Sequence, residues 1–406
     1  MLWERWDGTI TASSEVETIK AVIIPATMRR DGKADPTRRR MRLGLVHPTY
    51  WPEVRRGSER FVHDLAAYLA GRGHEVTVLT AHRGRPARSL EDGFAVVRGW
   101  RPPARLQPFG TEPHAAHAPL AFLAAAIRRF DLVHALHIPD GWAVSSWSRL
   151  TRMPLVLSLM GYPDRESLDA YRFRRAMLMR AAEGARAVHV LSEAAGRVLR
   201  EETGIDATAI NPGTDTSAFR LEVPRAESPT VFCAASPADP RKRVPLLVEA
   251  FSRVRRSDPE ARLVIGAGGS SDGDQRLLAA GVEVVDPGEE ELAAHYARSW
   301  ATVLPSAREA FGLVLVESLA AGTPAVGIRE GGVPEILDDP RVGVVSDSAE
   351  PEALADAIRR CLELSRRDGT REACRDHARR WDWQRVGPRF ESLYRDALGA
   401  RGSGRR

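Results

Sequence analysis

Cysteine is scarce in this chain, with Cys233, Cys361 and Cys374 as the only thiols in 406 residues. Three scattered cysteines are too few for a disulfide framework and lack the spacing of a thiolate metal site. Long apolar stretches are also missing. A bilayer span needs about 20 apolar residues, and the best candidate, Pro119 to Ile127, has less than half that length. We therefore expect a cytoplasmic protein, with enough residues for two hydrophobic cores.

The first 40 residues lack the features of a secretory signal peptide. Lys20 interrupts their only apolar patch, and just Ala21 to Pro25 is continuously apolar. The segment ends in three consecutive arginines, Arg38 to Arg40, and the recognisable domain begins at Met41. We interpret residues 1–40 as a disordered N-terminal extension. A start codon assigned too far upstream would give the same pattern.

Lysine is the rarest charged residue. Of 59 basic residues, only Lys20, Lys33 and Lys242 are lysine. The first two lie in the extension, so the folded body has one lysine in a background of arginine. The segment after Lys242, from Val244 to Phe251, is typical of a helix, and a compact ammonium at a helix start suits a diphosphate. Chance survival of one lysine in an arginine-rich chain is the alternative.

Strand and helix patterns alternate through the chain from Met41. Arg42 to His47, Gly57 to Leu69 and Glu75 to Thr80 together predict a strand, a helix and a second strand, which make a βαβ unit. Later strand patterns are Leu132 to Ala135, Leu155 to Leu159, Ala187 to Leu191, Ala209 to Pro212, Val231 to Ala235, Leu263 to Ile265, Val282 to Val285, Ala301 to Leu304 and Pro324 to Gly327. We predict an α/β protein with two doubly wound, Rossmann-like domains, residues 41–215 and 216–383.

Two glutamates stand eight residues apart around a glycine turn in the segment from Pro305 to Glu335. The apolar run before it is typical of a buried parallel strand, and Phe311-Gly312 opens an apolar helix. A strand that delivers a loop to a helix leaves the first backbone NH groups unpaired, which suits a phosphate or clustered sugar hydroxyls. Glu309 stands at that opening. Glu317, about two turns inside the helix, is placed to accept hydrogen bonds from a vicinal diol such as ribose.

With the sequences PS, FG, GTP and GGVPE in order around these glutamates, the segment resembles the donor site of retaining, nucleotide-sugar-dependent glycosyltransferases of family 4, or group 1. The resemblance covers most of the chain and implies the GT-B fold, with the acceptor bound by the first domain and the donor by the second. It implies that Glu309 contacts the transferred sugar and Glu317 the ribose. It assigns the backbone NH groups of Phe311, Gly312 and Leu313 to the sugar or its phosphate. Without these motifs, Glu309 would be interpreted as a solvated residue and Glu317 as a surface residue of an ordinary amphipathic helix.

The same resemblance assigns Lys242 to the donor phosphates. We predict that Lys242 and Glu309 are the two catalytic residues. The family often has an arginine five residues before this lysine, where Pro237 stands here. Arg241 or Arg243 is therefore the candidate for the missing donor-binding charge.

The first domain departs from the family pattern at two places. Arg56 and Gly57 replace two glycines after the first strand, so only Gly57 keeps a close backbone approach to the donor. Met160 stands where the family often directs a histidine at the donor sugar, and a thioether cannot replace an imidazole as a donor or base. His134 and His137 are nearby in sequence, but each is more simply explained as structural.

Two further features of the family occur in this sequence in the expected order along the chain. Ser192-Glu193 resembles its Ser-Glu pair, which a helix N-cap explains equally well. Residues 384–400 resemble a C-terminal helix that crosses back to the first domain. We interpret Trp381 and Trp383, just before it, as packing anchors and not as sugar platforms.

The resemblance implies transfer of a sugar from a UDP- or GDP-linked donor to a hydroxyl of a glycan, lipid-linked or small-molecule acceptor, without a cofactor. Asp272-Gly273-Asp274 is more simply a solvated loop than a metal site. We therefore predict a metal-independent reaction in which cationic side chains compensate the diphosphate charge. The alternatives are a sugar-nucleotide epimerase or hydrolase with the same donor site, and a noncatalytic subunit.

Charge is divided unevenly between the two halves. Residues 41–200 carry a net charge of +9, and residues 201–350 carry −11. The basic half would attract an anionic or lipid-phosphate acceptor, or hold the domain at the anionic inner face of a membrane. A solvated, arginine-rich surface explains the pattern equally well. Nucleic-acid binding is not favoured, because the basic residues are not interleaved with aromatic residues in a recognised module.

Overall fold

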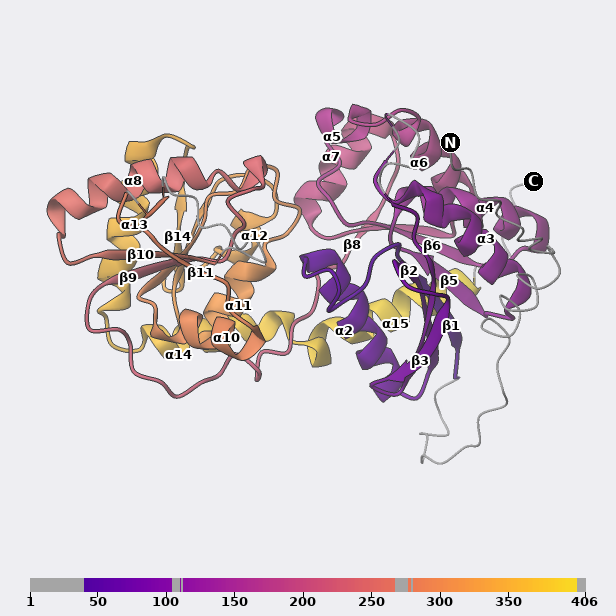
Figure 1. Cartoon of the computed structure of the whole chain (residues 1–406), viewed down its shortest axis with the longest axis horizontal. Coiled ribbons are helices and arrows are strands. Elements are labelled where there is room, and N and C mark those ends of the chain that lie inside the picture. Colours follow the sequence, from indigo (N-terminus) through magenta and orange to yellow (C-terminus); the bar gives the residue numbers. More distant parts are fainter. Residues whose placement is uncertain (1–39, 104–109, 111, 267–276, 279, 400–406) are drawn as a thin grey trace, which may run out of the picture.

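The computed structural model describes residues 40–103, 110, 112–266, 277–278 and 280–399. Two lobes lie side by side, and each is built on one β-sheet flanked by helices (Figure 1). The first sheet takes its strands from Arg42 to Ala209 and the second from Thr230 to Ser346. The chain therefore changes sheet between residues 209 and 230, a span that contains the predicted boundary at 215. The predicted class, α/β with two Rossmann-like domains, is confirmed.

The first sheet has eight strands in the order β3-β4-β2-β1-β5-β6-β7-β8. Its strands are β1 (Arg42–Val46), β2 (Glu75–His82), β3 (Ala87–Glu91), β4 (Phe94–Trp100), β5 (Leu132–Ala135), β6 (Leu155–Leu159), β7 (Ala187–Val190) and β8 (Thr208–Ala209). All neighbours pair in parallel except β3 and β4, which form an antiparallel hairpin at the edge. The sequence prediction omits this hairpin. Edge strand β3 alternates between half-buried and exposed residues and has no apolar run.

Helices cover both faces of the first sheet. They are α2 (Gly57–Gly71), α3 (Ala118–Ile127), α4 (Ile138–Thr151), α5 (Arg165–Asp169), α6 (Arg174–Gly184) and α7 (Glu193–Thr203), with a 3₁₀ turn η2 at Ala115–His117. Right-handed crossovers from strand to parallel strand place α3, α4, α6 and α7 on one face and α2 on the other. Two separate hydrophobic clusters, one against each face, form the core of this domain.

The second sheet has six strands, all parallel, in the order β11-β10-β9-β12-β13-β14. They are β9 (Thr230–Cys233), β10 (Arg262–Gly266), β11 (Glu283–Val285), β12 (Ala301–Leu304), β13 (Ala325–Ile328) and β14 (Gly343–Ser346). The helices are α8 (Val244–Ser257), α10 (Glu289–Arg298), α11 (Leu313–Ala321), α12 (Val333–Ile336), α13 (Pro351–Ser365) and α14 (Thr370–Ala378), with 3₁₀ turns η3 (Pro240–Lys242) and η4 (Arg379–Trp381). Because β9 and β12 are neighbours, the loops that follow them emerge together at one edge of the sheet.

The chain returns to the first domain after η4. Thr214 and Asp382 form a parallel bridge between the outgoing and returning segments. An added Cβ at Gly213 would lie 2.5 Å from the Trp383 ring, so the two segments pass in close contact. Helix α15 (Trp383–Gly399) then packs beside α2 (Figure 1). Trp381 and Trp383 are 3% and 7% exposed, which confirms that they are packing anchors.

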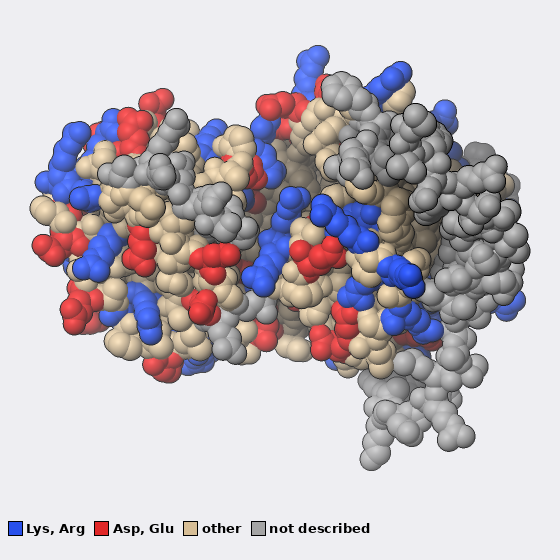
Figure 2. All heavy atoms as spheres, in the orientation of Figure 1, with Lys and Arg blue, Asp and Glu red and all other residues tan. Residues whose placement is uncertain are grey.

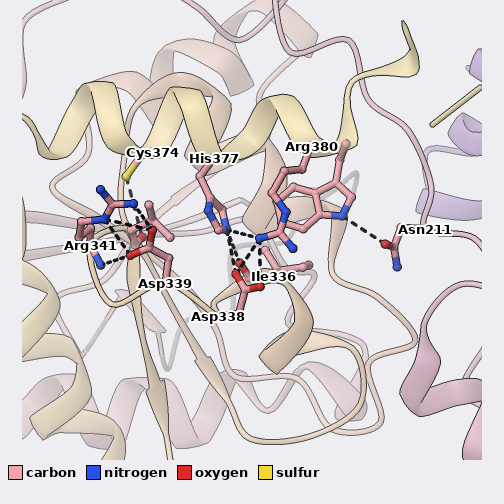
Figure 3. Close-up of polar contacts among 10 residues, drawn as sticks. Asn211, Ile336, Asp338, Asp339, Arg341, Cys374, His377 and Arg380 are labelled. Atoms are coloured by element: carbon pink, nitrogen blue, oxygen red, sulfur yellow. Dashed lines mark hydrogen bonds and ion pairs between the residues drawn. The ribbon is translucent and has the colours of Figure 1, made fainter. Parts of the chain in front are cut away.

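Polar contacts fix this return (Figure 3). His377 Nε2 lies 2.9 Å from a carbonyl oxygen at the end of α12, and Arg380 Nη1 donates to Asp338 Oδ1 at 2.8 Å. The Trp381 indole NH donates to Asn211 Oδ1 of the first domain at 3.4 Å. The crossing segment is thus tied to both domains.

The three cysteines are free and buried. Burial raises the pKa of the Cys233 and Cys361 thiols to about 12. Within the described part of the chain, no helix combines the length and apolarity needed to cross a membrane.

Candidate active site

The first glutamate of the motif lies on the loop between β12 and α11, at the sheet edge where open α/β folds bind ligands. Gly312 ends this loop with a φ of 111°, and an added Cβ would lie 3.3 Å from the Leu304 side chain. This conformation is not helical, so α11 begins at Leu313 and not at Phe311-Gly312, where the sequence prediction placed its start. The Phe311 side chain is buried, and its ring packs 6.2 Å from that of Trp381.

The start of α11 exposes backbone donors. The first NH groups of a helix have no carbonyl one turn earlier to bond. Among the described residues, no acceptor is recorded for the NH groups of Phe311, Gly312 or Leu313. These are the three groups that the family resemblance gives to the sugar or its phosphate, and that role stays a prediction.

The two residues predicted to be catalytic form an ion pair. Lys242 Nζ donates to Glu309 Oε2 at 3.0 Å, and the two side chains are 26% and 18% exposed. A backbone hydrogen bond from Ala307 N to Arg241 O, 2.7 Å long, joins the same two loops. Residues 67 positions apart in the sequence are therefore held together at the edge of the sheet.

Each cation of the Arg241-Lys242-Arg243 segment holds a different carboxylate. Arg241 pairs with Asp239 at 2.7 Å, and Arg243 pairs with Glu330 at 2.8 Å. The hydrogen bonds that Arg241 donates to Asp239 raise the pKa of the Arg241 guanidinium, although its partial burial acts in the opposite direction. A diphosphate that bound to these cations would compete with carboxylates of the protein itself.

Glu330, which the sequence analysis missed, bridges two loops. Its carboxylate accepts from Arg243 Nη1 at 2.8 Å and from the backbone NH of Arg308 at 3.2 Å. Both arginines have left-handed backbones, with φ of 47° and 51°. Arg243 follows Lys242 and Arg308 precedes Glu309, so Glu330 fixes the chain on both sides of the ion pair. Its position directly before Gly331-Gly332 is the one signal in the sequence that could have found it.

The paired glycines after Glu330 pack against the backbone of Glu309. Gly332 N donates to Glu309 O at 3.0 Å. Gly331 has a φ of 58°, and an added Cβ would lie 1.9 Å from the same carbonyl oxygen. The predicted close approach of a second backbone segment is confirmed.

Glu317, the second glutamate of the motif, is buried, with 5% of its surface exposed. Its Oε2 accepts from the Tyr296 hydroxyl at 2.9 Å, and its Oε1 lies 3.6 Å from Nη1 of Arg60 in the first domain. Burial and the Glu317 carboxylate raise the pKa of Tyr296 well above its ordinary value, so the phenol remains a donor. The interpretation of Glu317 as a solvated surface residue is wrong. Neither Tyr296 nor Arg60 carried a signal in the sequence.

Gly57 faces α11 across the domain boundary. An added Cβ would lie 3.9 Å from Leu313 Cδ1, an ordinary van der Waals distance. Arg56, the N-cap of α2, is exposed, and no partner of its guanidinium is recorded in the described residues. Figure 2 shows basic side chains on the first lobe beside its junction with the second. The start of α2 therefore brings an exposed positive charge next to the start of α11.

Met160 and His134 both have structural surroundings. Met160 is half-buried and packs against a core cluster of each domain. His134 is fully buried, with Nε2 2.5 Å from Ser158 Oγ and Nδ1 2.8 Å from the Tyr394 hydroxyl. Burial lowers the pKa of His134 well below its ordinary value. The structure thus agrees with a structural role for His134.

His137 lies in a separate polar cluster at the carboxyl edge of the first sheet. Its Nδ1 is 3.3 Å from Asp140 Oδ2, which is also 3.0 Å from His117 Nδ1. Its Nε2 is 3.7 Å from Glu112 Oε1. Burial alone would lower the pKa of His137, but the two carboxylates raise it. This cluster lies in the first domain, and the sequence analysis named only one of its members, His137, as a candidate.

The last residue of GGVPE contacts the first domain. Glu335 accepts from the backbone NH groups of Glu193 and Ala194 at 3.1 and 2.8 Å. Ser192 Oγ accepts from Ala195 N at 3.1 Å, so the predicted N-cap is confirmed. Two motifs from different domains meet at the start of α7.

The described residues contain no group of three or more His, Cys, Asp or Glu side chains that is arranged to hold a metal ion. Asp272, Asp274 and the glycine-rich loop before them lie outside the described residues. Metal independence therefore stays a prediction.

Two family models match the chain. One, described as glycosyl transferases group 1, matches residues 215–381, and the other, glycosyltransferase family 4, matches residues 55–218. The chain belongs to this glycosyltransferase family. The border between the two matches lies in the segment that joins the two sheets.

Named relatives belong to the same family. The D-inositol 3-phosphate glycosyltransferase of Corynebacterium kroppenstedtii is 31% identical over 213 residues, which are 48% of this chain and 47% of that protein. The chain thus spans about half the length of this and similar curated relatives. The phosphatidyl-myo-inositol mannosyltransferase of Mycobacterium tuberculosis is 28% identical over 89% of this chain and 98% of its own.

Solved glycosyltransferases share the fold. Sucrose-phosphate synthase from Thermosynechococcus elongatus aligns with a TM-score of 0.75 at 21% identity, over 89% of this chain and 100% of its own. HepE of Anabaena, in complex with UDP-glucose, aligns with a TM-score of 0.65 at 18% identity, over 87% of this chain and 99% of its own. The predicted GT-B fold is confirmed for this family member.

Gly331→Ala should strongly destabilise the contact between the loop after β13 and the backbone of Glu309. A left-handed backbone costs a residue with a Cβ about 1 to 2 kcal/mol, and here the Cβ also meets a backbone oxygen. Gly369→Ala is the matched control, because Gly369 has a φ of 79° but no atom within 4 Å of an added Cβ. We expect thermal unfolding of Gly331→Ala to show an additional loss of about 1 to 3 kcal/mol. Equal losses in both variants would contradict the close approach.

Proposed function

We propose that this glycosyltransferase moves a sugar from a nucleoside diphosphate donor to an acceptor hydroxyl with retention at the anomeric carbon. The observation that carries the proposal is the contact between Lys242 and Glu309, 3.0 Å long, at the start of α11. An ammonium, a carboxylate and backbone NH groups that have no acceptor among the described residues therefore lie at one edge of the second sheet. A diphosphate and a sugar with several hydroxyls need this combination of donors and acceptors.

In the proposed reaction, Lys242 and the NH groups of α11 compensate the charge that develops on the departing diphosphate. Glu309 accepts from a hydroxyl of the transferred sugar. Glu317 accepts from the ribose once the donor displaces one of its present contacts. Because the Glu309 carboxylate is held by Lys242 and no other carboxylate is assigned to attack the sugar, we favour a front-face displacement assisted by the leaving diphosphate.

The names of the relatives support this proposal without fixing the substrates. One is named for transfer to inositol 3-phosphate, another for transfer of mannose to phosphatidylinositol, and a solved neighbour holds UDP-glucose. We therefore favour a UDP- or GDP-linked sugar and a phosphorylated or lipid-linked acceptor. The buried free cysteines suit the cytoplasm, where we place the reaction.

The proposal is tested by incubating the full chain with a panel of UDP- and GDP-sugars, with and without inositol phosphate and lipid acceptors. We expect a glycosylated product that retains the donor anomeric configuration by NMR, and we expect EDTA to leave its formation intact. An epimerised nucleotide sugar or free sugar would support the epimerase or hydrolase instead. Donor binding without any product would indicate a noncatalytic subunit. Loss of activity in EDTA that a divalent ion restores would contradict metal independence.

Lys242→Ala should lower turnover at saturating donor about ten- to a hundredfold, because a charge-assisted contact to the leaving group is worth about 1.5 to 3 kcal/mol. Lys242→Arg should recover only part of this loss, since a planar guanidinium does not reproduce a compact ammonium. Arg341→Ala is a control, because the Arg341 side chain lies in the same domain, is 77% exposed and pairs with Asp339. Unchanged turnover in Lys242→Ala would remove this residue from the mechanism.

Glu330→Ala should lower turnover about tenfold with little change in melting temperature. Its half-exposed ion pair adds little stability, but its two contacts hold the chain beside Lys242 and beside Glu309. Glu330→Gln should restore most of the turnover, because the amide oxygen still accepts a hydrogen bond. A lower melting temperature with unchanged turnover would show that Glu330 stabilises the fold without positioning the pair.

A further inference from the structure

Helix α3 turns three of its four large apolar side chains outward, whereas the fourth, Leu120, packs against the core. Its buried positions are all alanine, namely Ala118, Ala121, Ala124 and Ala125. Its exposed positions are Pro119, Phe122, Leu123 and Ile127, and the last three are 36 to 37% exposed. A surface helix normally buries its large apolar residues and exposes polar ones. The reversed pattern leaves an apolar stripe along the helix.

Neighbouring helices extend this stripe into a surface. Helix α4 packs between α3 and α6 on the side of the first lobe that faces away from the second (Figure 1). Trp142 and Leu150 on α4 are 44% and 78% exposed, and Met179 on α6 is 37% exposed. The rings of Phe122 and Trp147, 5.9 Å apart, join α3 to α4. We call this surface, formed by the exposed residues of α3, α4 and α6, the α3–α4–α6 face.

Arginines border the α3–α4–α6 face. Arg129 follows the end of α3 and Arg152 is the C-cap of α4, and both are exposed. Among the described residues, neither guanidinium has a recorded partner. Arg149 and Arg180 add charge between α4 and α6, at 42% and 65% exposure, with Glu183 as their shared carboxylate. The apolar surface is therefore bordered by excess positive charge.

We propose that the α3–α4–α6 face docks on an anionic lipid bilayer. Exposed aromatic and aliphatic side chains beside arginines match the interface of such a bilayer, where apolar groups enter the headgroup region and cations meet lipid phosphates.

The position of the α3–α4–α6 face indicates which kind of acceptor a docked protein would reach. Helices α3 and α4 begin at the carboxyl edge of the first sheet, where His117 and Asp140 lie 3.0 Å apart. The family resemblance gives the acceptor to the first domain, and open α/β folds bind ligands at this edge. A docked face would therefore place the acceptor side next to the lipid headgroups, and the acceptor would be a lipid-linked hydroxyl. This last step rests on the proposed function, whereas docking itself does not.

The test is flotation of the full chain with vesicles of phosphatidylcholine alone or mixed with phosphatidylglycerol. We expect binding to the mixed vesicles only, and weaker binding at high salt. The double variant Phe122→Ser and Leu123→Ser should bind at least about tenfold more weakly. Arg129→Glu with Arg152→Glu should lose roughly fivefold or more per arginine.

A matched control is Leu90→Ser with Leu278→Ser, which removes two large apolar side chains, 59% and 56% exposed, from other surfaces. It should bind vesicles as the wild type does. Absence of vesicle binding by the wild type, or an equal loss in this control, would overturn the proposal. So would a wild-type dimer in sedimentation velocity that Phe122→Ser with Leu123→Ser dissociates, because the face would then join two copies. Flotation needs neither donor nor acceptor, so its failure is distinct from a failure of glycosyl transfer.

Discussion

The ion pair between Lys242 and Glu309 depends on how three loops are positioned relative to one another. These loops follow β9, β12 and β13, and backbone hydrogen bonds from Ala307 and Gly332 join them in pairs. A half-exposed ion pair contributes only about 0 to 1 kcal/mol by itself, so it cannot hold the loops. The backbone contacts and the bridging carboxylate of Glu330 do so, and the pair is a consequence of that arrangement. The site is thus rigid where its chemistry needs fixed distances.

The sequence predicted the strands, helices and loops of this site better than it predicted which charged side chains pair with one another. Glycines, apolar runs and the motif residues are local signals, so most strands, α11 and the Glu309 loop were predictable within one or two residues. Three consecutive cations, Arg241 to Arg243, take carboxylates at positions 239, 309 and 330. Composition and spacing do not determine which carboxylate each cation takes, because that depends on strand order and loop conformation. The contact of Arg60 with Glu317 was unpredictable for the same reason.

Residues of the segment from Pro305 to Glu335 also hold the two domains together. Glu317 contacts Arg60, Glu335 caps the start of α7, and Arg308 pairs with Asp164 and Glu166 of the first domain. Charged caps and partly exposed ion pairs are each worth about 1 kcal/mol. Because the same side chains belong to the proposed donor site and to the domain contact, donor binding as proposed would be coupled to domain position.

The arrangement of α3 changes how the charge imbalance between the halves is interpreted. From sequence alone, a basic first domain fits a solvated arginine surface and a membrane surface equally. Helix α3 exposes Phe122, Leu123 and Ile127, and its buried positions are alanines. Exposed apolar area lowers solubility without adding to the core. A purely solvated surface therefore does not explain this arrangement. The alanines let α3 lie close to the sheet. The large side chains are then available to a second apolar phase, and the exposed Arg129 and Arg152 lie where lipid phosphates would meet them in the proposed docking.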